Sequence, residues 1–452
     1  MYIDYQMEDT IVAISTPPGE GAIGIVRLSG KDAISIVNKI FSVPIDGAES
    51  HRIFYGFIQD PDTKEKIDEV IVSVMRAPRS YTRQDVVEIN CHGGYIPLNR
   101  TLSLVVRAGA RPAEPGEFTK RAFLNGRIDL TQAEAVIDII RAKTSKAEKV
   151  ALAQLSGALG RKINTLRERL IEILAHIEAY IDFPEEEIEP DSLITITSKT
   201  EDIIRELSEM LKTYEEGRLI KEGVRVAIVG KPNVGKSSLL NTLLKADRAI
   251  VTESPGTTRD IIEEHMEIDG LTIRIMDTAG IREAHDMAEI EGVKRSLKAI
   301  EHSDIVLAVF DGSLPLTKED LEVIEKTKER PTIFVLNKSD LPQRDIDIPN
   351  AIRISTKTEQ GIDRLKKEIY NLSIKSTQDY EGIIITNLRH KTALENSKER
   401  LRSALSALKE GLPLELISLE LRESVQSLAS LTGEITNEDI LEKIFSDFCI
   451  GK

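Results

Sequence analysis

The first quarter of the chain alternates short β-type runs with turn residues. Residues 10–15 and 23–28 are rich in Ile and Val, and Pro17-Pro-Gly19 lies between them. β-Branched residues are favoured in strands, whereas proline and glycine mark the turns that join them. The pattern predicts an α+β domain over residues 1–118.

Helical spacing replaces this pattern in two later parts of the chain. Residues 162–183, 394–408 and 416–431 carry apolar side chains three or four positions apart, as one face of an amphipathic helix does. Neither helical part, 119–219 or 376–452, is expected to bury its apolar stripe alone. We therefore expect one discontinuous helical domain, although the chain order also permits two separate bundles.

Residues 220–375 lie between the helical parts and have the pattern of an inserted α/β domain. Apolar runs at 226–229, 273–276 and 332–336 have the length of buried strands, and a Leu-rich helical segment follows the first of them. This arrangement predicts a mixed, mostly parallel sheet. The whole chain is thus expected to be multidomain, with α/β and all-α parts.

A phosphate-binding sequence follows the first of these strands. Residues 230–237, Gly-Lys-Pro-Asn-Val-Gly-Lys-Ser, match G-x-x-x-x-G-K-[ST]. The glycines let backbone N–H groups surround the β-phosphate, and the N-terminus of the next helix adds a positive dipole. Lys236 would contact the β- and γ-phosphate oxygens, and Ser237 would bind Mg²⁺.

Two further motifs follow the second and third strands. Asp277-Thr-Ala-Gly280 places a carboxylate near Mg²⁺ and a backbone N–H near the γ-phosphate. Asn337-Lys-Ser-Asp340 ends in a carboxylate that suits guanine, whose edge offers two N–H donors where adenine has a bare ring nitrogen. The three motifs predict a Ras-like P-loop GTPase, and Ser355-Thr-Lys357 is a weaker signal for a loop over the base. The expected GTP-binding residues are Asn233, Val234, Gly235, Lys236, Ser237, Ser238, Asp277, Thr278, Ala279, Gly280, Asn337, Lys338, Asp340, Ser355, Thr356 and Lys357.

Composition narrows the class of protein. The formal net charge of −15 argues against a protein that coats nucleic acid nonspecifically, but it leaves room for a tRNA on a local basic patch. Basic stretches such as 143–149 are better explained as solvated helix faces. No apolar run has the length of a membrane span, and only Cys91 and Cys449 are present. We expect a cytoplasmic protein without membrane attachment.

Two other local patterns are set aside. Gly19, Gly21 and Gly24 satisfy G-x-G-x-x-G, but a strand rather than a helix follows them, which argues against a dinucleotide site. Cys91 and His92 are neighbours on a predicted strand and should point to opposite faces. Adjacency alone therefore does not make them a nucleophile and its base.

Motifs outside the GTPase segment resemble one family, the MnmE (TrmE) family of tRNA-modification GTPases. The resemblance runs from residue 9 to residue 452 in the same domain order, and the C-terminal tail is its most diagnostic element. The motifs are Asp9-Thr-Ile-Val-Ala, Thr16-Pro-Pro-Gly19, His92-Gly-Gly94, Glu114-Pro-Gly-Glu-Phe118, Arg121-Ala-Phe-Leu-Asn125, the switch I sequence Gly256-Thr-Thr-Arg-Asp260 and the ending Phe448-Cys-Ile-Gly-Lys452.

The resemblance implies a specific activity. Members of the family work with an FAD-dependent partner, MnmG (GidA), in a heterotetramer or larger complex. They add a carboxymethylaminomethyl or aminomethyl group to C5 of the wobble uridine of certain tRNAs. The N-terminal domain, residues 1–118, would form the homodimer and bind 5,10-methylene- or 5-formyl-tetrahydrofolate, the source of the one-carbon unit.

Four positions match the folate site of the family: Arg27, Glu88, Arg127 and Lys452. A carboxylate can accept hydrogen bonds from pterin N–H groups, and basic residues suit the glutamate tail of folate. Arg127 stands where some members have lysine, so the charge is kept while the contact geometry differs.

The resemblance also implies an unusual hydrolytic mechanism. Ile281 stands where Ras-like enzymes place a water-orienting glutamine, and an apolar side chain cannot orient water. In the family a glutamate of switch II has that role, and the matching position is Glu289. A potassium ion replaces the arginine finger. The positions that match the potassium ligands of the family are Asn233, Thr252, Ser254 and Thr257. Thr258 would bind Mg²⁺ together with Ser237. The resemblance adds Glu253, Pro255 and Gly256 to the GTP-binding residues.

Cys449 and the overall function keep alternatives open. The Cys449 thiolate could add to C6 of uridine and so activate C5. Alternatively, Cys449 could pack beside the folate site. The flavoprotein partner could equally carry out the covalent step. A rival function is a ribosome-assembly GTPase of Era or Der type, and a third is a folate aminomethyltransferase that GTP only regulates. Folate binding separates the first rival from the family, because such a switch has no use for folate.

Overall fold

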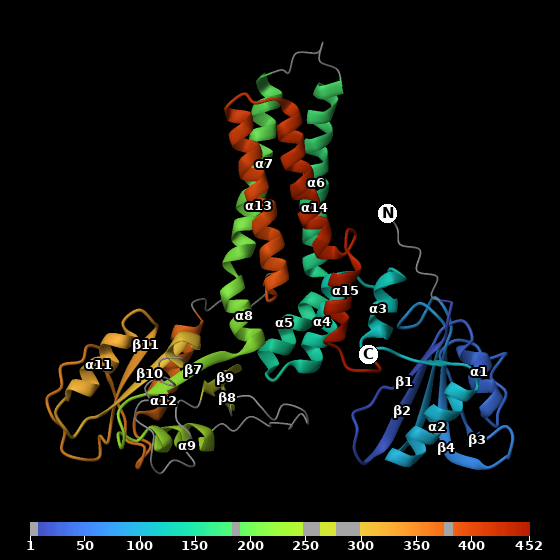
Figure 1. Ribbon diagram of the computed structural model, residues 1–452, viewed down its shortest axis with the longest axis horizontal. Coiled ribbons are helices and arrows are strands. Elements are labelled where there is room, and N and C mark those ends of the chain that lie inside the picture. The colour runs from blue at the N-terminus through green and yellow to red at the C-terminus, as the bar shows by residue number, and fades with distance from the viewer. Residues whose placement is uncertain (1–7, 183–189, 247–262, 277–298, 375–382) are drawn as a thin grey trace. The chain divides into compact units, whose positions relative to one another are not determined.

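The computed structural model describes residues 8–182, 190–246, 263–276, 299–374 and 383–452 (Figure 1). The chain forms two compact units. Unit 1 contains residues 1–137, 154–171 and 425–452, and unit 2 contains residues 138–153 and 172–424. Each unit therefore joins segments that are distant in the sequence.

A six-stranded sheet with the order β3-β4-β5-β2-β1-β6 forms the centre of unit 1. Every neighbouring pair is antiparallel except β1 and β6, which are parallel. Helices α1 and α2 contribute to the apolar core on one face of this sheet. The bounds are β1 Ile11–Ile14, β2 Gly21–Ser29, α1 Ala33–Ile40, β3 Arg52–Gln59, β4 Lys66–Met75, β5 Val86–Gly93, α2 Tyr95–Arg107 and β6 Arg111–Pro112.

The glycine-rich segment between β1 and β2 does not have the geometry of a dinucleotide site. Gly21 and Gly24 belong to strand β2, and a Cβ on Gly24 would lie 2.5 Å from Leu98 of α2. Gly24 thus allows helix and sheet to pack closely. Cys91 and His92 point to opposite faces of their strand, as predicted. Cys91 is buried, whereas the His92 ring is exposed and bonds to Asp68.

The remainder of unit 1 is helical and includes the C-terminus. Helices α3 (Glu117–Leu124), α4 (Leu130–Arg141) and α15 (Glu438–Ser446) share an apolar cluster that contains Leu130, Leu441 and Phe445. Burying the facing apolar sides of α4 and α15 together removes both from water. The C-terminal helix consequently packs beside residues that precede it by about 300 positions in the sequence.

Long helices on both sides of the inserted domain form the discontinuous helical domain, as predicted. Within unit 2, α7 packs along α13, and the Ser397 and Ser424 hydroxyls hydrogen bond at 2.8 Å inside the helical layer. None of the helices in the described ranges is both long and apolar enough to cross a membrane. The bounds are α5 Ser145–Leu155, α6 Ala158–Asp182, α7 Pro190–Lys212, α8 Tyr214–Glu222, α13 Leu388–Lys409 and α14 Leu414–Thr432.

The inserted domain is built on a second six-stranded sheet with the order β12-β11-β10-β7-β9-β8. All neighbouring pairs are parallel except β8 with β9, which confirms the mixed, mostly parallel sheet. Parallel strands gather their carboxyl ends at one edge, where ligands of α/β proteins bind. The bounds are β7 Val224–Val229, α9 Lys236–Ala246, β8 Glu263–Ile268, β9 Leu271–Met276, β10 Ile305–Asp311, α11 Lys318–Thr327, β11 Thr332–Asn337, β12 Ile352–Arg353 and α12 Ile362–Ser373.

Candidate nucleotide and cofactor sites

The phosphate-binding loop lies between β7 and α9 in unit 2. Val234 is buried in the apolar core below the loop, whereas Asn233 is exposed. The Nζ atom of Lys236 donates hydrogen bonds to the carbonyl oxygens of Gly230 at 2.7 Å and Lys231 at 2.8 Å. Burial lowers the pKa of Lys236. A phosphate group would give this half-buried ammonium a negatively charged partner in place of the two neutral carbonyls.

Asn337 connects this loop to the segment after β12. Its side chain is almost fully buried, and Nδ2 donates to the carbonyl of Val234 at 2.9 Å. Its Oδ1 accepts the backbone N–H of Thr356 at 3.2 Å. The structure therefore joins residues from three of the predicted GTP-binding segments through one amide. Sequence reasoning placed Asn337 in the site but did not anticipate this bridging position.

Asp340 lies at the place predicted for guanine recognition, after strand β11. Its Oδ1 accepts a hydrogen bond from Ser355 Oγ at 2.7 Å, and this bond is the main reason that the pKa of Asp340 is lowered. The carboxylate is thus kept charged, as pairing with two N–H donors of a base requires. Ser355 also accepts N–H groups from Lys357 and Thr358, so it shapes the 355–357 segment.

Two carboxylates beside the site were not found from the sequence. Asp311, the last residue of β10, pairs with Lys338 at 2.6 Å, and Asp320 of α11 pairs with Lys231 at 2.7 Å. Burial alone would raise the pKa of Asp311, but hydrogen bonds from Lys338 and Ser313 hold it below its usual value. The available signal was the position of Asp311 at the carboxyl end of a further apolar run, where parallel strands present functional groups.

The remaining predicted nucleotide and metal residues lie outside the described residues. They are Thr252, Glu253, Ser254, Pro255, Gly256, Thr257, Thr258, Asp277, Thr278, Ala279, Gly280 and Glu289. Among the described residues, no group of three His, Cys, Asp or Glu side chains could hold a metal ion. Ser237 is the described residue whose hydroxyl suits Mg²⁺ together with nucleotide phosphates.

A substitution at Gly235 tests whether the contact between the loop and Asn337 matters. A Cβ there would lie 2.2 Å from Asn337 Nδ2, and the backbone has φ +96. We expect Gly235→Ala to lower the free energy of unfolding by roughly 1–3 kcal/mol and to weaken nucleotide binding. Gly411→Ala is the control, because Gly411 also has positive φ (+68) but nothing within 4 Å. Thermal unfolding and nucleotide titration of both variants measure the difference. Equal effects in both would mean that the contact with Asn337 is unimportant.

A second set of predicted residues meets in unit 1. Arg27 of β2 and Glu88 of β5 are direct partners in the strand register. Both Nε and Nη2 of Arg27 lie 2.8 Å from Glu88 Oε1. Arg27 Nη1 also donates to the carbonyl oxygen of Gly451 at 3.3 Å. The pair is only about one-fifth exposed and joins the sheet to the C-terminal tail.

Aromatic rings extend this cluster toward Arg127. The guanidinium of Arg127 lies 4.7 Å from the centre of the Tyr81 ring, and that of Arg27 lies 6.0 Å from the same ring. The Arg27 guanidinium is also 5.8 Å from the Phe118 ring. Cations favour the faces of aromatic rings. Tyr81 therefore connects two of the predicted folate residues, a role for which the sequence offered no signal.

The C-terminal tail is held against the N-terminal part of unit 1. Ile450 forms a β-bridge with Pro115, and the backbone N–H of Gly116 donates to Cys449 O at 3.4 Å. Gly451 has φ +95, and a Cβ there would lie 2.5 Å from the carbonyl oxygen of Ile14. Lys452, the fourth predicted folate residue, is half-buried directly after it. The structure thus brings Arg27, Glu88, Arg127 and the tail into one region.

The two cysteines differ in accessibility. Cys449 is exposed in the tail. Cys91 is buried, and burial raises the pKa of its thiol to about 11. A thiol that stays protonated is a poor nucleophile. Of the two, only Cys449 is placed where a substrate could reach it.

The sequence matches two family descriptions over most of its length. The family description "MnmE helical domain" matches residues 130–449, and "GTP-binding protein TrmE N-terminus" matches residues 10–127. The tRNA modification GTPase MnmE of Thermoanaerobacter pseudethanolicus is 48% identical, over 98% of this chain and 99% of its own. The chain belongs to the MnmE family of tRNA-modification GTPases. The relatives of Alkaliphilus oremlandii and Moorella thermoacetica carry the same name and are 45% and 49% identical over nearly their whole length.

Membership in the MnmE family makes the chain a GTPase. A GTPase of this family uses GTP and Mg²⁺. The solved G domain of the T. maritima FeoB iron transporter is 25% identical and covers 33% of this chain and 99% of its own. Its TM-score of 0.25 supports no argument about the fold.

Proposed function

We propose that this GTPase modifies the wobble uridine of certain tRNAs together with an FAD-dependent partner of MnmG (GidA) type. The product would carry a carboxymethylaminomethyl or aminomethyl group at C5, with its one-carbon unit from tetrahydrofolate. The observation that supports this best is the Arg27–Glu88 pair that holds the C-terminal tail through Gly451. A GTPase that only switches ribosome assembly, of Era or Der type, has no need for such a cluster.

GTP would bind with its phosphates at the loop between β7 and α9. Lys236 would exchange the carbonyls of Gly230 and Lys231 for β- and γ-phosphate oxygens, and Ser237 would bind Mg²⁺. Asp340 would accept the two N–H donors of guanine while Ser355 keeps its carboxylate oriented. These residues position the nucleotide and stabilise charge, which is most of what phosphoryl transfer requires.

Hydrolysis would depend on Glu289 and on potassium. Ile281 cannot orient water, so a second polar group is needed, and Glu289 is the proposed residue. Asn233 of the loop is exposed and adopts positive φ (65), which leaves its amide oxygen accessible to a cation. Asn233, Thr252, Ser254 and Thr257 are the proposed potassium ligands, and Thr258 the second Mg²⁺ ligand. Oxygen ligands suit both ions.

Folate would bind in unit 1 beside the Arg27–Glu88 pair. Glu88 would accept N–H groups of the pterin, while Arg27 and Arg127 would flank Tyr81 and face the anionic end of the molecule. Lys452 would complete the site from the tail. Bound tetrahydrofolate would supply the one-carbon unit, and the residues named here would hold and orient it.

A binding experiment separates this proposal from the ribosome-assembly alternative. We expect Glu88→Gln, and deletion of residues 449–452, to weaken binding of 5-formyltetrahydrofolate at least about tenfold, because a charge-assisted contact is lost in each. GTP binding, measured in parallel, should be unchanged. Equilibrium dialysis gives both affinities, and Glu65→Gln, just before β4, is the control. Failure of the unmodified protein to bind folate would refute the folate part of the proposal.

The exposed face of the unit 1 sheet supports self-association. Ile53, Tyr55 and Ile71 are exposed on β3 and β4, and Tyr55 lies directly opposite Ile71. Contiguous exposed apolar residues on a folded domain mark interaction sites. We infer that two copies of the chain join through this face. Light scattering of the full chain tests the homodimer, and a monomer mass at micromolar concentration would contradict it.

Cys449 and the location of the reaction complete the proposal. The exposed thiol in the tail could attack C6 of uridine, or it could pack near folate while the flavoprotein carries out the covalent step. Replacement of Cys449 by serine, followed by analysis of modified tRNA, distinguishes a nucleophile from a packing residue.

The reaction would take place in the cytoplasm, where tRNA, GTP and reduced folates are available.

A further inference from the structure

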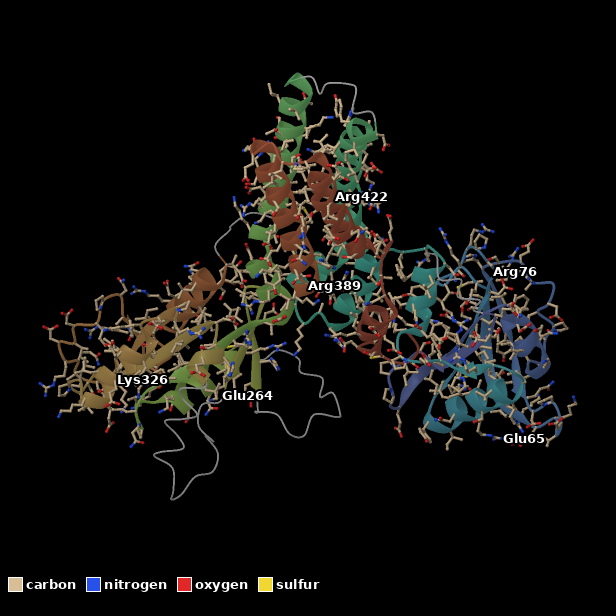
Figure 2. The ribbon with its side chains drawn as sticks, turned by 45° about the horizontal axis from the view of Figure 1, so that its top comes forward. Glu65, Arg76, Glu264, Lys326, Arg389 and Arg422 are labelled. Carbon is tan, nitrogen blue, oxygen red and sulfur yellow. The ribbon has the colours of Figure 1, made fainter. Side chains whose placement is uncertain are left out.

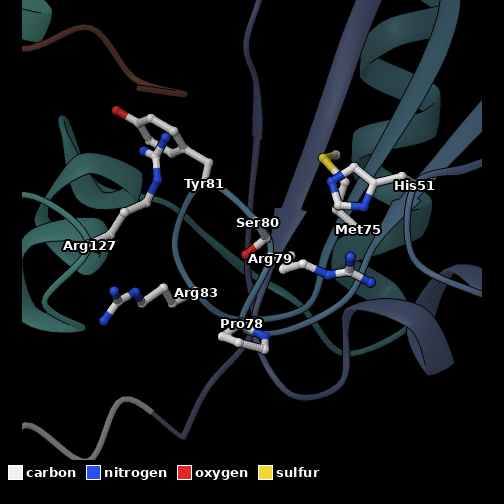
Figure 3. Close-up of a pocket in the computed structure, with 8 residues that line it drawn as sticks. All are labelled: His51, Met75, Pro78, Arg79, Ser80, Tyr81, Arg83 and Arg127. Carbon is white, nitrogen blue, oxygen red and sulfur yellow. The ribbon is translucent and has the colours of Figure 1, made fainter. Parts of the chain in front are cut away.

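A cationic pocket lies beside the proposed folate residues. It has a volume of about 720 Å³ and opens between the end of β4, the loop of residues 76–85 and Arg127. Figure 3 shows Arg83 and Arg127 on one side of this loop, Arg79 and His51 on the other, and the Ser80 hydroxyl between them. The pocket therefore has polar groups along its length.

Positive charge dominates the lining of the pocket. Arg79, Arg83 and Arg127 supply three guanidinium groups, and no carboxylate is among the described residues that line it. Within the described part of the chain, Arg79 has no hydrogen bond or ion pair, and Arg83 donates only to the carbonyl of Asn125, at 3.0 Å. The side chains of Arg79, Arg83 and Arg127 are exposed, so an anion in solution can reach them. An anion would neutralise these groups.

Tyr81 links the pocket to the Arg27–Glu88 pair. Tyr81 and Arg127 line the pocket, and the same Tyr81 ring lies within 6.0 Å of the Arg27 guanidinium. A ligand that begins at Glu88 and passes Tyr81 and Arg127 would next meet Arg83 and Arg79. These groups suit a ligand that has a polar ring at one end, near Glu88, and carboxylates at the other end, near the arginines.

The loop that carries the arginines is held in place before any ligand binds. Ala77 N–H donates to Asp85 Oδ1 at 2.8 Å, and the Ser80 hydroxyl donates to Gln84 O. Arg76 anchors the start of the loop, because its Nε donates to the carbonyl of Ala48 at 2.7 Å. A preorganised loop loses less conformational entropy on binding.

We propose that this pocket binds the γ-linked polyglutamate tail of a folate whose pterin lies at Glu88. This inference rests on the proposed function and extends it to the form of the substrate. Each added glutamate brings one more carboxylate, and guanidinium groups pair with carboxylates in a bidentate manner. Arg127 would take the first glutamate, and Arg83 and Arg79 those that follow.

A tRNA backbone fits the pocket less well. Proteins bind nucleic acid backbones with charges spread along many phosphates, whereas here three arginines line one cavity. The lining also joins the Tyr81 ring that faces Arg27, which places the charges in line with the folate residues. Carboxylates of a short flexible chain are therefore the better match.

Calorimetry with two folates tests the proposal on the full chain. We expect 5-formyltetrahydrofolate with three glutamates to bind about tenfold tighter than the form with one, and the advantage to shrink as salt is raised. In Arg79→Gln the ratio of the two affinities should fall below about two. Arg83→Gln should act in the same direction, but Arg79→Gln is the cleaner variant because Arg79 makes no polar contact within the described residues.

Arg100→Gln is the matched control and should keep the tenfold ratio. Arg100 is also an exposed arginine of unit 1, but unlike Arg79 it is ion-paired, with Glu65. Glu65 precedes β4 and Arg76 follows it, and Figure 2 shows these two residues at opposite ends of the strand. Equal binding of both folates to the unmodified protein would overturn the inference and leave the folate site standing. Tighter triglutamate binding that Arg79→Gln and Arg83→Gln do not alter would also overturn it. Binding of neither folate would refute the proposed folate site itself. Loss of tRNA binding in both arginine variants, with the folate ratio unchanged, would assign the pocket to nucleic acid instead.

Discussion

Replacement of Lys236 by alanine is expected to reduce GTP hydrolysis by about 10²–10³-fold, the loss typical of one preorganised group that stabilises transition-state charge. The Lys236 ammonium bonds to the carbonyls of Gly230 and Lys231 and, in the proposed site, would exchange them for β- and γ-phosphate oxygens. GTP binding should weaken as well. Phosphate release, measured in potassium and again in sodium, gives the rates. The proposed potassium site predicts that the unmodified protein is also slow in sodium.

Lys245→Ala is the control for this variant. Lys245 lies on the same helix, α9, but in its last turn, and its side chain is exposed. The control should hydrolyse GTP at the rate of the unmodified protein. Thermal unfolding of both variants shows whether the loop keeps its structure without the Lys236 hydrogen bonds. If a folded Lys236→Ala protein hydrolysed GTP normally, the nucleotide site would be wrongly placed.

Asp340→Asn is expected to change the nucleotide preference of the protein from GTP to XTP. An amide presents a donor where the carboxylate presents an acceptor, and xanthine carries a carbonyl where guanine carries an amino group. GTP affinity should fall on the order of 10²-fold because the two N–H donors of guanine lose their acceptor, and XTP affinity should rise. The Ser355 hydroxyl, 2.7 Å from Asp340, can serve either side chain and should keep it oriented.

Competition of the two nucleotides for a fluorescent analogue measures this exchange. Asp345→Asn, a nearby carboxylate outside the predicted binding residues, should leave the preference for GTP intact. If Asp340→Asn still preferred GTP, the carboxylate would not contact the base. Equal weakening of GTP and XTP would indicate damage to the loop rather than altered pairing.

The nucleotide-binding half of the fold could be predicted because its signals are local. Strand, glycine-rich turn and helix follow one another directly in β7 and α9, so apolar runs and motif spacing suffice. Even there the strands are longer than the apolar runs. β7 begins at Val224, and its second residue, Arg225, pairs with Asp304, an ion pair that a hydrophobic run does not reveal. Strand edges are therefore less predictable than strand centres.

The cluster in unit 1 could not have been assembled from the residues alone. Arg27 and Glu88 meet across strands 61 positions apart, and Arg27 reaches Gly451 over 424 positions. Such pairings depend on strand register and on how the tail returns to the sheet, and neither follows from local pattern. The resemblance to a family singled out Arg27 and Glu88, but the positions of Tyr81 and Arg79 emerged only from the fold.

The measurement that tests the central claim most directly is mass spectrometry of tRNA nucleosides from host cells with and without this gene. The account predicts that C5-aminomethyl-type wobble uridines disappear in the deletion strain. They should return with the unmodified gene but not with the Lys236→Ala variant. Unchanged nucleosides, accompanied by accumulation of ribosomal precursor particles, would contradict the tRNA-modification function and favour a ribosome-assembly GTPase.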